Sequence, residues 1–293
     1  MERTKYKKPS LILTSDWHLR EDTPICFTGD FQKEQWEAVE YVKGIQLQWE
    51  CPVIHAGDLF HHWKPSPALL SQAMWFLPQN FKTIYGQHDL PAHNWNLREK
   101  SGLHTLKVAG VLNILPGCHY GQEPTDPTIR ACEFTKQKNI LVWHHLTYIN
   151  KPYPEATGGM AEGILRKYPQ FSLICTGDNH QSFSTEYQGR LLVNPGNLTR
   201  QTADQADYQP RVALWYAETN TIEWVNIPIQ QGVISREHLD RKEERDQRID
   251  AFISKLSNEY EIGLSFEQNL NTFFEKNNIK DTVKELIFKA IEK

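Results

Sequence analysis

The chain has 293 residues, of which 39% are hydrophobic and 23% are charged, and its formal net charge at pH 7 is -4. This composition is typical of a globular chain with a buried core, and it excludes a disordered or fibrous protein. Acidic residues slightly outnumber basic ones both before and after residue 234, so net charge gives no argument for nucleic-acid binding.

Short apolar runs predict β-strands at residues 11–14, 52–55, 81–85, 140–143 and 171–175. Polar side chains that can bind metal ions or transfer protons follow these runs: Asp16, His18, Asp58, Gln87, His88, Asp89, His144, His145, Asp178 and His180. In open α/β sheets, ligands bind at the carboxyl ends of the strands, because the loops that leave this edge converge on one crevice. We therefore expect these side chains to lie together.

Apolar residues at helical spacing predict helices between the first strands. One helix covers residues 36–49, and another begins at Ser66 and Pro67, a favourable pair for the N-cap and first helical positions. Apolar runs at residues 191–193, 212–216 and 221–225 follow one another closely and predict paired strands with no helix between them. An α/β fold with a mixed sheet, or with two packed sheets, therefore fits better than a purely parallel sheet.

The sequence changes in character from about residue 234. Residues 236–250 are mostly charged, and three amphipathic stretches follow within residues 249–260, 266–274 and 283–291. We therefore expect a first domain at residues 1–233 and a helical C-terminal region at residues 234–293. This region must bury its apolar face, which predicts homodimerisation or docking to a partner.

Targeting and redox signals are absent from the sequence pattern. No apolar stretch approaches the roughly 18 residues of a membrane span, and the basic start leads into a run too short for the core of a signal peptide. The five cysteines are odd in number and never spaced C-x-x-C, which argues against a disulfide framework or a zinc knuckle. We expect a cytoplasmic protein with reduced cysteines and no membrane partner.

The polar side chains after the strands have the chemistry of a metal site. In Asp16-x-His18, and again in Asp178-x-His180, the two side chains are two positions apart and face the same way from an extended segment. Imidazole, carboxylate and amide oxygen without thiolate suit divalent metals of intermediate to hard character. Two such pairs and a carboxylate able to bridge predict two divalent ions, roughly 3.5 to 4 Å apart as in other two-metal sites.

The order of these motifs resembles that of the calcineurin-like metallophosphoesterase superfamily. The matching segments are Asp16-Trp17-His18, Gly57-Asp58, Gly86-Gln87-His88-Asp89, His144 and Gly177-Asp178-Asn179-His180. Within the superfamily, Gly57-Asp58-Leu59-Phe60 is most similar to the SbcD-type DNA repair nucleases and their phage relatives. The resemblance implies a sandwich of two mixed β-sheets flanked by helices, with the helical C-terminal region as an appendage.

The resemblance also implies the ligands of each metal. The first ion would be held by Asp16, His18, Asp58 and His180, and the second by Asp58, Gln87, His144 and Asp178, with Asp58 as the bridge. Gln87 replaces the usual Asn and Asp178 replaces a usual His, so the second ion has harder ligands that favour Mn²⁺ over Zn²⁺. His145 is the alternative to His144, because adjacent residues of a strand face opposite ways, and the register of the family favours His144.

The same resemblance implies the catalytic roles. His88 would protonate the leaving oxygen, and Asp89 would orient the ring of His88 and stabilise its charged form. Two divalent cations would lower the pKa of a water between them and supply hydroxide for in-line attack on phosphorus. We expect a metal-dependent phosphodiesterase, most similar to a DNA exonuclease or endonuclease.

Two other functions compete with this prediction. One is a phosphoesterase that acts on a small molecule or a phosphoprotein. The other is a catalytically silent scaffold, which His88 and the complete set of first-metal ligands disfavour.

Contacts to DNA are predicted for residues on loops after the motif strands, where rings can stack on bases and cations can bind phosphates: His61, His62, Trp63 and Arg200. The resemblance also implies an SMC-like ATPase as a partner subunit.

Overall fold

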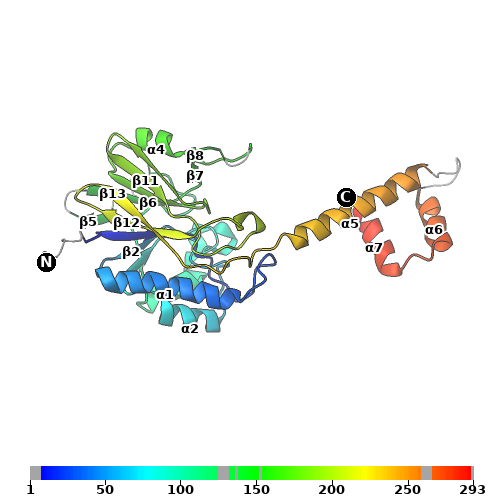
Figure 1. Ribbon diagram of the computed structural model, residues 1–293, viewed down its shortest axis with the longest axis horizontal. Coiled ribbons are helices and arrows are strands. Elements are labelled where there is room, and N and C mark those ends of the chain that lie inside the picture. Colours follow the sequence, from blue (N-terminus) through cyan, green and yellow to red (C-terminus); the bar gives the residue numbers. More distant parts are fainter. Residues whose placement is uncertain (1–7, 125–131, 136–137, 152–153, 259–265, 292–293) are drawn as a thin grey trace. The chain divides into compact units, whose positions relative to one another are not determined.

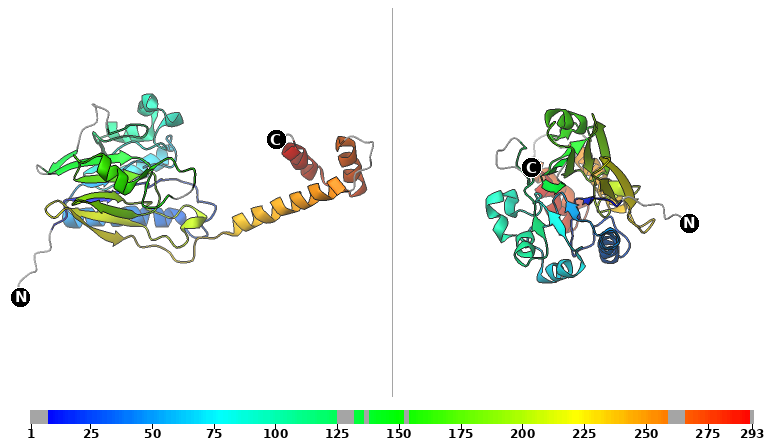
Figure 2. Two further views of the ribbon diagram at one scale, coloured as in Figure 1. Left: turned by 90° about the horizontal axis from the view of Figure 1, so that it is seen from above. Right: turned by 90° about the vertical axis from the view of Figure 1, so that its left-hand side faces the viewer.

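The computed structural model describes residues 8–124, 132–135, 138–151, 154–258 and 266–291. The chain divides into two compact units, Met1–Ile234 and Ser235–Lys293 (Figure 1). The first unit contains two mixed β-sheets and the helices that cover them (Figure 2).

The first sheet has six strands in the order β13-β12-β1-β2-β3-β4. The pairs β1–β2, β2–β3 and β3–β4 are parallel, whereas β12 is antiparallel to both β1 and β13. The strands are β1 (Leu11–Thr14), β2 (Val53–His55), β3 (Phe81–Thr83), β4 (Asn113–Ile114), β12 (Arg211–Tyr216) and β13 (Thr221–Asn226).

The second sheet has five strands in the order β10-β11-β9-β6-β5. Strand β9 runs parallel to β6 and β11, and the outer strands β10 and β5 are antiparallel to their neighbours. The strands are β5 (Cys132–Thr135), β6 (Lys138–His144), β9 (Leu173–Gly177), β10 (Phe183–Tyr187) and β11 (Arg190–Asn194), and β7 (Thr147–Tyr148) and β8 (Gly159–Met160) form a separate small pair.

The helices of the first unit begin where the sequence supplies caps. The carboxylate of Asp30 accepts a hydrogen bond from the Lys33 N–H at the start of α1, and the Ser66 hydroxyl caps α2 with Pro67 behind it, as the sequence predicts. The α-helices are α1 (Phe31–Trp49), α2 (Pro67–Phe76), α3 (Gly102–Val108) and α4 (Ala161–Lys167), and the 3-10 turns are η1 (Pro91–His93), η2 (Trp95–Lys100) and η3 (Ala203–Gln205).

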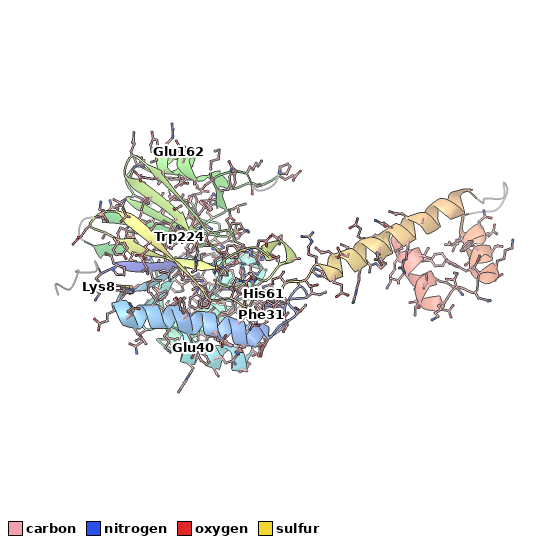
Figure 3. The ribbon with its side chains drawn as sticks, in the orientation of Figure 1. Lys8, Phe31, Glu40, His61, Glu162 and Trp224 are labelled. Carbon is pink, nitrogen blue, oxygen red and sulfur yellow. The ribbon has the colours of Figure 1, made fainter. Side chains whose placement is uncertain are left out.

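The inner strands β1, β2, β9 and β11 are buried on both faces, which explains why they are continuous apolar runs. Leu13 of β1 packs between the sheets with Val142 of β6, whereas Ile12 packs on the other face of the first sheet with Val39 of α1. A third apolar cluster lies between the second sheet and α4. Glu40 of α1 and Glu162 of α4 mark opposite outer faces (Figure 3). The predicted sandwich of two mixed sheets flanked by helices is confirmed.

The second unit contains α5 (Glu237–Asn258), α6 (Phe266–Lys276) and α7 (Asp281–Ile291). Leu270 and Phe274 of α6 and Ile287 of α7 form a small buried cluster between these two helices. The role of this region in dimerisation or partner docking stays a prediction. Among the described residues, every helix is too short or too polar to cross a membrane.

Candidate active site

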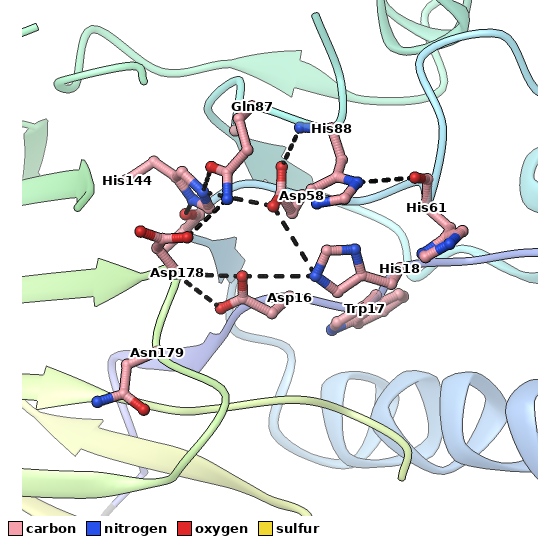
Figure 4. Close-up of polar contacts among 12 residues, drawn as sticks. Asp16, Trp17, His18, Asp58, His61, Gln87, His88, His144, Asp178 and Asn179 are labelled. Atoms are coloured by element: carbon pink, nitrogen blue, oxygen red, sulfur yellow. Dashed lines mark hydrogen bonds and ion pairs between the residues drawn. The ribbon is translucent and has the colours of Figure 1, made fainter. Parts of the chain in front are cut away.

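The predicted site residues converge where the two sheets meet (Figure 4). Asp16 follows β1, Asp58 follows β2, Asp178 follows β9, and His144 is the last residue of β6. Because β1–β2 and β6–β9 are parallel pairs, their carboxyl ends lie at one edge of each sheet. Face-to-face packing of the sheets then brings the two edges together.

Asp58 lies at the centre of the site and is fully buried. Its Oδ1 accepts a hydrogen bond from the His88 N–H at 2.8 Å. Its Oδ2 lies 3.8 Å from His18 Nε2 and 3.5 Å from His144 Nε2, and no described group donates a hydrogen bond to it. Burial opposes ionisation of Asp58, but the charge of His144 outweighs this cost and holds the pKa of the carboxyl below its usual range.

The His18 ring has the burial and the protonation state that a metal ligand requires. The ring is buried, and neither ring nitrogen has a hydrogen-bond partner within the described part of the chain. Burial lowers the pKa of His18 well below 6.5, and the neighbouring His180 and His88 lower it further, so the ring is neutral. Buried polar atoms without partners cost free energy, and a neutral imidazole nitrogen offers the lone pair that a metal requires.

Asp16 places a buried carboxyl group at the same position. The carboxylate is fully buried, and it accepts hydrogen bonds from the Asp178 N–H at 3.1 and 3.2 Å. Burial raises the pKa of Asp16 to about 8, and the nearby charges of Asp58 and Asp178 act in the same direction. Crowding of carboxyl groups in a buried site disfavours their ionised forms, and a bound divalent cation would favour them.

The residues present therefore fit divalent metals. Two overlapping groups, Asp16 with His18 and His180, and Asp16 with Asp58 and His144, have ligand atoms within 4.8 Å of one another. The atoms without partners on His18 and Asp58 face this cluster (Figure 4). Carboxylate and imidazole are donors that suit a divalent ion of intermediate to hard character.

Gln87 connects the other predicted ligands of the second metal. Its Nε2 donates to Asp178 Oδ1 at 2.6 Å, and its Oε1 accepts a hydrogen bond from His144 Nε2. His144 Nδ1 donates to the Ala56 carbonyl at 2.7 Å, so Nε2 is the nitrogen that would bind a metal, and the metal would displace the proton that Nε2 shares with Gln87. Burial lowers the pKa of His144, but the charge of Asp58 outweighs burial and raises the pKa to about 10.

His145, the alternative ligand, instead stacks on Trp143 with ring centroids 4.1 Å apart. Of the two adjacent histidines, His144 is therefore the one that lies at the metal-ligand cluster.

His88 lies beside the cluster of candidate metal ligands, and its ring has a fixed orientation. Its ring centroid is 4.8 Å from that of His18, and its Nδ1 donates to the His61 carbonyl at 2.8 Å. A carbonyl only accepts, so the proton is on Nδ1 and the remaining nitrogen, Nε2, is available to a ligand.

The predicted role of Asp89 as the partner of the His88 ring is wrong. The buried Asp89 carboxylate instead accepts hydrogen bonds from four backbone N–H groups: Asp58 at 2.9 Å, Leu59 at 3.3 Å, Phe60 at 3.2 Å and Gly86 at 3.1 Å. Burial raises the pKa of Asp89 to about 7, and the charge of Asp58 adds to this effect. Asp89 therefore positions the loop that carries Asp58, and the His61 carbonyl orients His88.

The loops that carry the ligands are tightly folded. Asp16, His18, Asp58 and Asp178 all have a left-handed backbone, with φ of 50°, 45°, 59° and 76°. Such conformations are unfavourable for residues with a Cβ and concentrate at functional sites. Gly86 permits the closest approach, because a Cβ there would lie 2.1 Å from Asp58 Oδ1.

Of the predicted substrate contacts, His61 lies at the site, whereas His62 and Trp63 lie outside the metal-ligand groups. His61 lies at the site, with its ring stacked on His88 at 5.6 Å and a nitrogen within 4.8 Å of those of His18 and His88. His62 and Trp63 contact each other at 5.4 Å between ring centroids and are outside the described metal-ligand groups.

Arg200 is not a substrate contact, and that prediction is wrong. Its side chain is 1% exposed, and its guanidinium pairs with Glu34 at 3.5 Å and donates to the carbonyls of Ala206 and Gln230. The positive charge is therefore neutralised inside the protein. Two further rings lie at the site although no sequence motif contains them. His93 lies next to His88, and Tyr120 lies next to His144.

The fold and the cluster define a metallophosphoesterase type of protein. The family model for the calcineurin-like phosphoesterase superfamily domain matches residues 10–219, which contain every predicted metal ligand and His88. The chain therefore belongs to the calcineurin-like phosphoesterase superfamily, whose members bind divalent metals and hydrolyse phosphoesters.

A comparison with solved structures matches three phosphoesterases or predicted phosphoesterases. An archaeal phosphodiesterase is 15% identical, with 74% of this chain and 98% of that chain covered and a TM-score of 0.44. A predicted phosphoesterase from Streptococcus pneumoniae is 16% identical, with 70% and 80% covered and a TM-score of 0.35. A metallophosphoesterase from Sphaerobacter thermophilus is 11% identical, with 75% and 89% covered and a TM-score of 0.38. A search of curated proteins finds no significant match.

Proposed function

We propose that this chain is a metal-dependent phosphodiesterase that cleaves DNA, with an activity of the kind found in SbcD-type nucleases. The observation that carries the proposal is the placement of His88. Its backbone N–H donates to Asp58, its ring centroid lies 4.8 Å from that of His18, and no group in the described part of the chain hydrogen-bonds its Nε2. A proton donor thus stands beside a cluster suited to divalent metals. The Gly57-Asp58-Leu59-Phe60 segment supports DNA as the substrate.

The residues that would hold the ions are the two predicted sets. Asp16, His18, Asp58 and His180 would hold the first ion, and Asp58, Gln87, His144 and Asp178 the second. When bound, the ions would supply positive charge to the phosphate oxygens and lower the pKa of a water. Because the second set has more oxygen donors, Mn²⁺ is the proposed metal.

His88 would act on the leaving oxygen. The His61 carbonyl holds the Nδ1–H of His88, and the backbone bond to Asp58 fixes the residue relative to the metal cluster. With the ring held at these two points, a protonated Nε2 would give its proton to the alkoxide as the P–O bond breaks. A fixed orientation matters because proton transfer requires hydrogen-bond distance.

A phosphodiesterase for small molecules is the second candidate. It is favoured by the net charge of -4 and by the burial of Arg200, which removes a predicted phosphate contact from the surface. A silent scaffold is disfavoured because the proton donor and the buried ligand cluster are both present.

The test uses the full chain loaded with Mn²⁺ and a panel of end-labelled single-stranded, double-stranded and hairpin DNA, with a nitrophenyl phosphodiester in parallel. Asp58→Asn is the matched control, because it removes the central charge. Release of nucleotides by the wild type but not by the control supports the nuclease. Hydrolysis of the small ester without any cleavage of DNA supports the second candidate, and metal binding without turnover of either supports the scaffold.

The second unit carries a separate proposal, that it docks to a second copy of the chain or to an SMC-like ATPase. Val283 and Leu286 of α7 are exposed, although α7 also contributes Ile287 to a buried cluster. Exposed apolar groups on a helix of this kind commonly mark an interface. Light scattering of the wild type and of Leu286→Glu tests the homodimer directly, because a mass unaffected by the substitution would exclude α7 from it.

A further inference from the structure

Four aromatic rings form a row along one side of the cluster of candidate metal ligands: His88, His93, Tyr120 and His144. From His88 the centroid of His93 is 6.4 Å away, Tyr120 follows 6.0 Å from His93, and His144 follows 6.4 Å from Tyr120. His88 and His144 belong to the site already described. His93 and Tyr120 have no role there, although they connect its two ends.

His93 is exposed and has an unusual backbone. Its φ is 54°, and the preceding Ala92 has φ of 49°, so two consecutive residues with a Cβ adopt the left-handed conformation. No side-chain hydrogen bond of His93 is present among the described residues. Left-handed backbone is strained for residues with a Cβ, and strain of this kind clusters at functional sites.

The turn that carries His93 is held firmly from both sides. The His93 N–H donates to the Leu90 carbonyl at 3.1 Å, and the Asn94 N–H donates to the Pro91 carbonyl at 3.0 Å. Trp95, two residues further on, stacks on His119 with centroids 4.4 Å apart, and the Arg98 guanidinium lies 4.5 Å from the Trp95 ring. These contacts fix the backbone, so the ring of His93 is presented beside His88 at little further entropic cost.

We propose that His93, together with Tyr120, binds the base of the nucleoside that leaves during cleavage. This inference rests on the proposed phosphodiesterase function. If His88 protonates the leaving oxygen, the group attached to that oxygen lies next to His88, and His93 is the exposed ring on this side that no metal set uses. The His93 and Tyr120 rings are nearly perpendicular, at 80°, so a base can stack on the face of His93 while Tyr120 borders it, and every base has a face that can stack in this way.

The experiment compares three dinucleotides with Mn²⁺-loaded protein: thymidylyl-thymidine, and the two forms in which an abasic unit replaces one nucleoside or the other. The variants are His93→Ala, which removes the ring, and His93→Phe, which keeps a ring without hydrogen-bonding atoms. We expect His93→Ala to lower kcat/KM on thymidylyl-thymidine about tenfold, His93→Phe to restore most of it, and the loss to vanish on the dinucleotide with an abasic leaving unit.

A stability measurement separates function from structure. The melting temperature of His93→Gly should equal or exceed that of the wild type, because glycine relieves the left-handed backbone. A lower melting temperature would make His93 a structural residue and overturn the inference. An equal loss on all three dinucleotides would also overturn it, as would unchanged kcat/KM in His93→Ala. Failure of the wild type to cleave any dinucleotide or DNA would instead refute the proposed function itself.

Discussion

The carboxylate of Asp89 accepts a hydrogen bond from the backbone N–H of Asp58 at 2.9 Å, across 31 positions of the chain. The same carboxylate collects the N–H groups of Leu59, Phe60 and Gly86. It therefore ties the loop after β2 to the loop after β3, and it does so next to the carboxylate that both proposed metals share.

Substitution Asp89→Asn should weaken metal binding and stability together. Asparagine has the same shape, but its amide nitrogen would face backbone donors, and loss of charge-assisted hydrogen bonds should cost about 3 kcal/mol in the free energy of unfolding. Mn²⁺ titration and thermal unfolding measure the two effects, with the exposed Asp207→Asn as control. A variant with normal Mn²⁺ affinity and only a slower rate would show that Asp89 acts on His88 after all.

Removal of the His88 ring should slow turnover and leave the metals bound. Because His88 is proposed to protonate the leaving oxygen, His88→Ala should lower kcat on an alkoxide leaving group by roughly 10² to 10⁴, and much less on nitrophenolate, which needs no proton. Steady-state rates on both esters and the metal content of the purified variant provide the measurement. His238→Ala, in α5 of the second unit, is the control. Equal losses on the two esters would contradict the role in proton transfer.

Gly86→Ala should displace the central carboxylate. The added Cβ would lie 2.1 Å from Asp58 Oδ1 and 2.5 Å from the Asp58 nitrogen, so the loop must move. We expect loss of Mn²⁺ binding and of activity in a protein that still folds around its sheets. Gly44→Ala in α1 is the matched control, since its Cβ meets nothing within 4 Å. Full Mn²⁺ affinity in Gly86→Ala would mean that the loop position is not important for the metals.

His119 should make stability depend on pH in the acid range. Burial lowers the pKa of His119 to about 4, and its Nδ1 accepts the Tyr85 N–H at 3.1 Å, so the ring is neutral when folded. The unfolded chain takes up a proton near the ordinary pKa of 6.5 and the folded protein only near 4, so stability falls as pH drops from about 6.5 to 4.

Substitution His119→Asn isolates this effect. Asparagine keeps an acceptor for the Tyr85 N–H but does not titrate, so the variant should lose less stability across that pH window, by about 3 kcal/mol at most. Urea unfolding at pH 7, 6, 5 and 4 gives the comparison, with the exposed His62→Asn as control. Parallel curves for His119→Asn and the wild type would exclude His119 as a source of acid lability.

Much of the fold and the composition of the site were predictable from the sequence. Strands buried on both faces are continuous apolar runs, and the caps at Ser66 and Pro67 are local signals, so element types follow from neighbouring residues. Polar residues after parallel strands meet because strand ends share an edge, which predicts the cluster of Asp16, Asp58 and His144. The edge strand β10 was missed because it is only partly buried and lacks an apolar run.

Only the tertiary structure decided which partner each polar group takes. Asp89 turns to four backbone donors instead of the adjacent His88 ring, Arg200 is neutralised by Glu34 from 166 positions away, and Trp95 holds the turn that presents His93. Spacing along a chain reports which face a residue occupies, because the backbone repeats locally. Hydrogen bonds and ion pairs between distant segments depend on how the sheets and loops pack, and no periodicity encodes that.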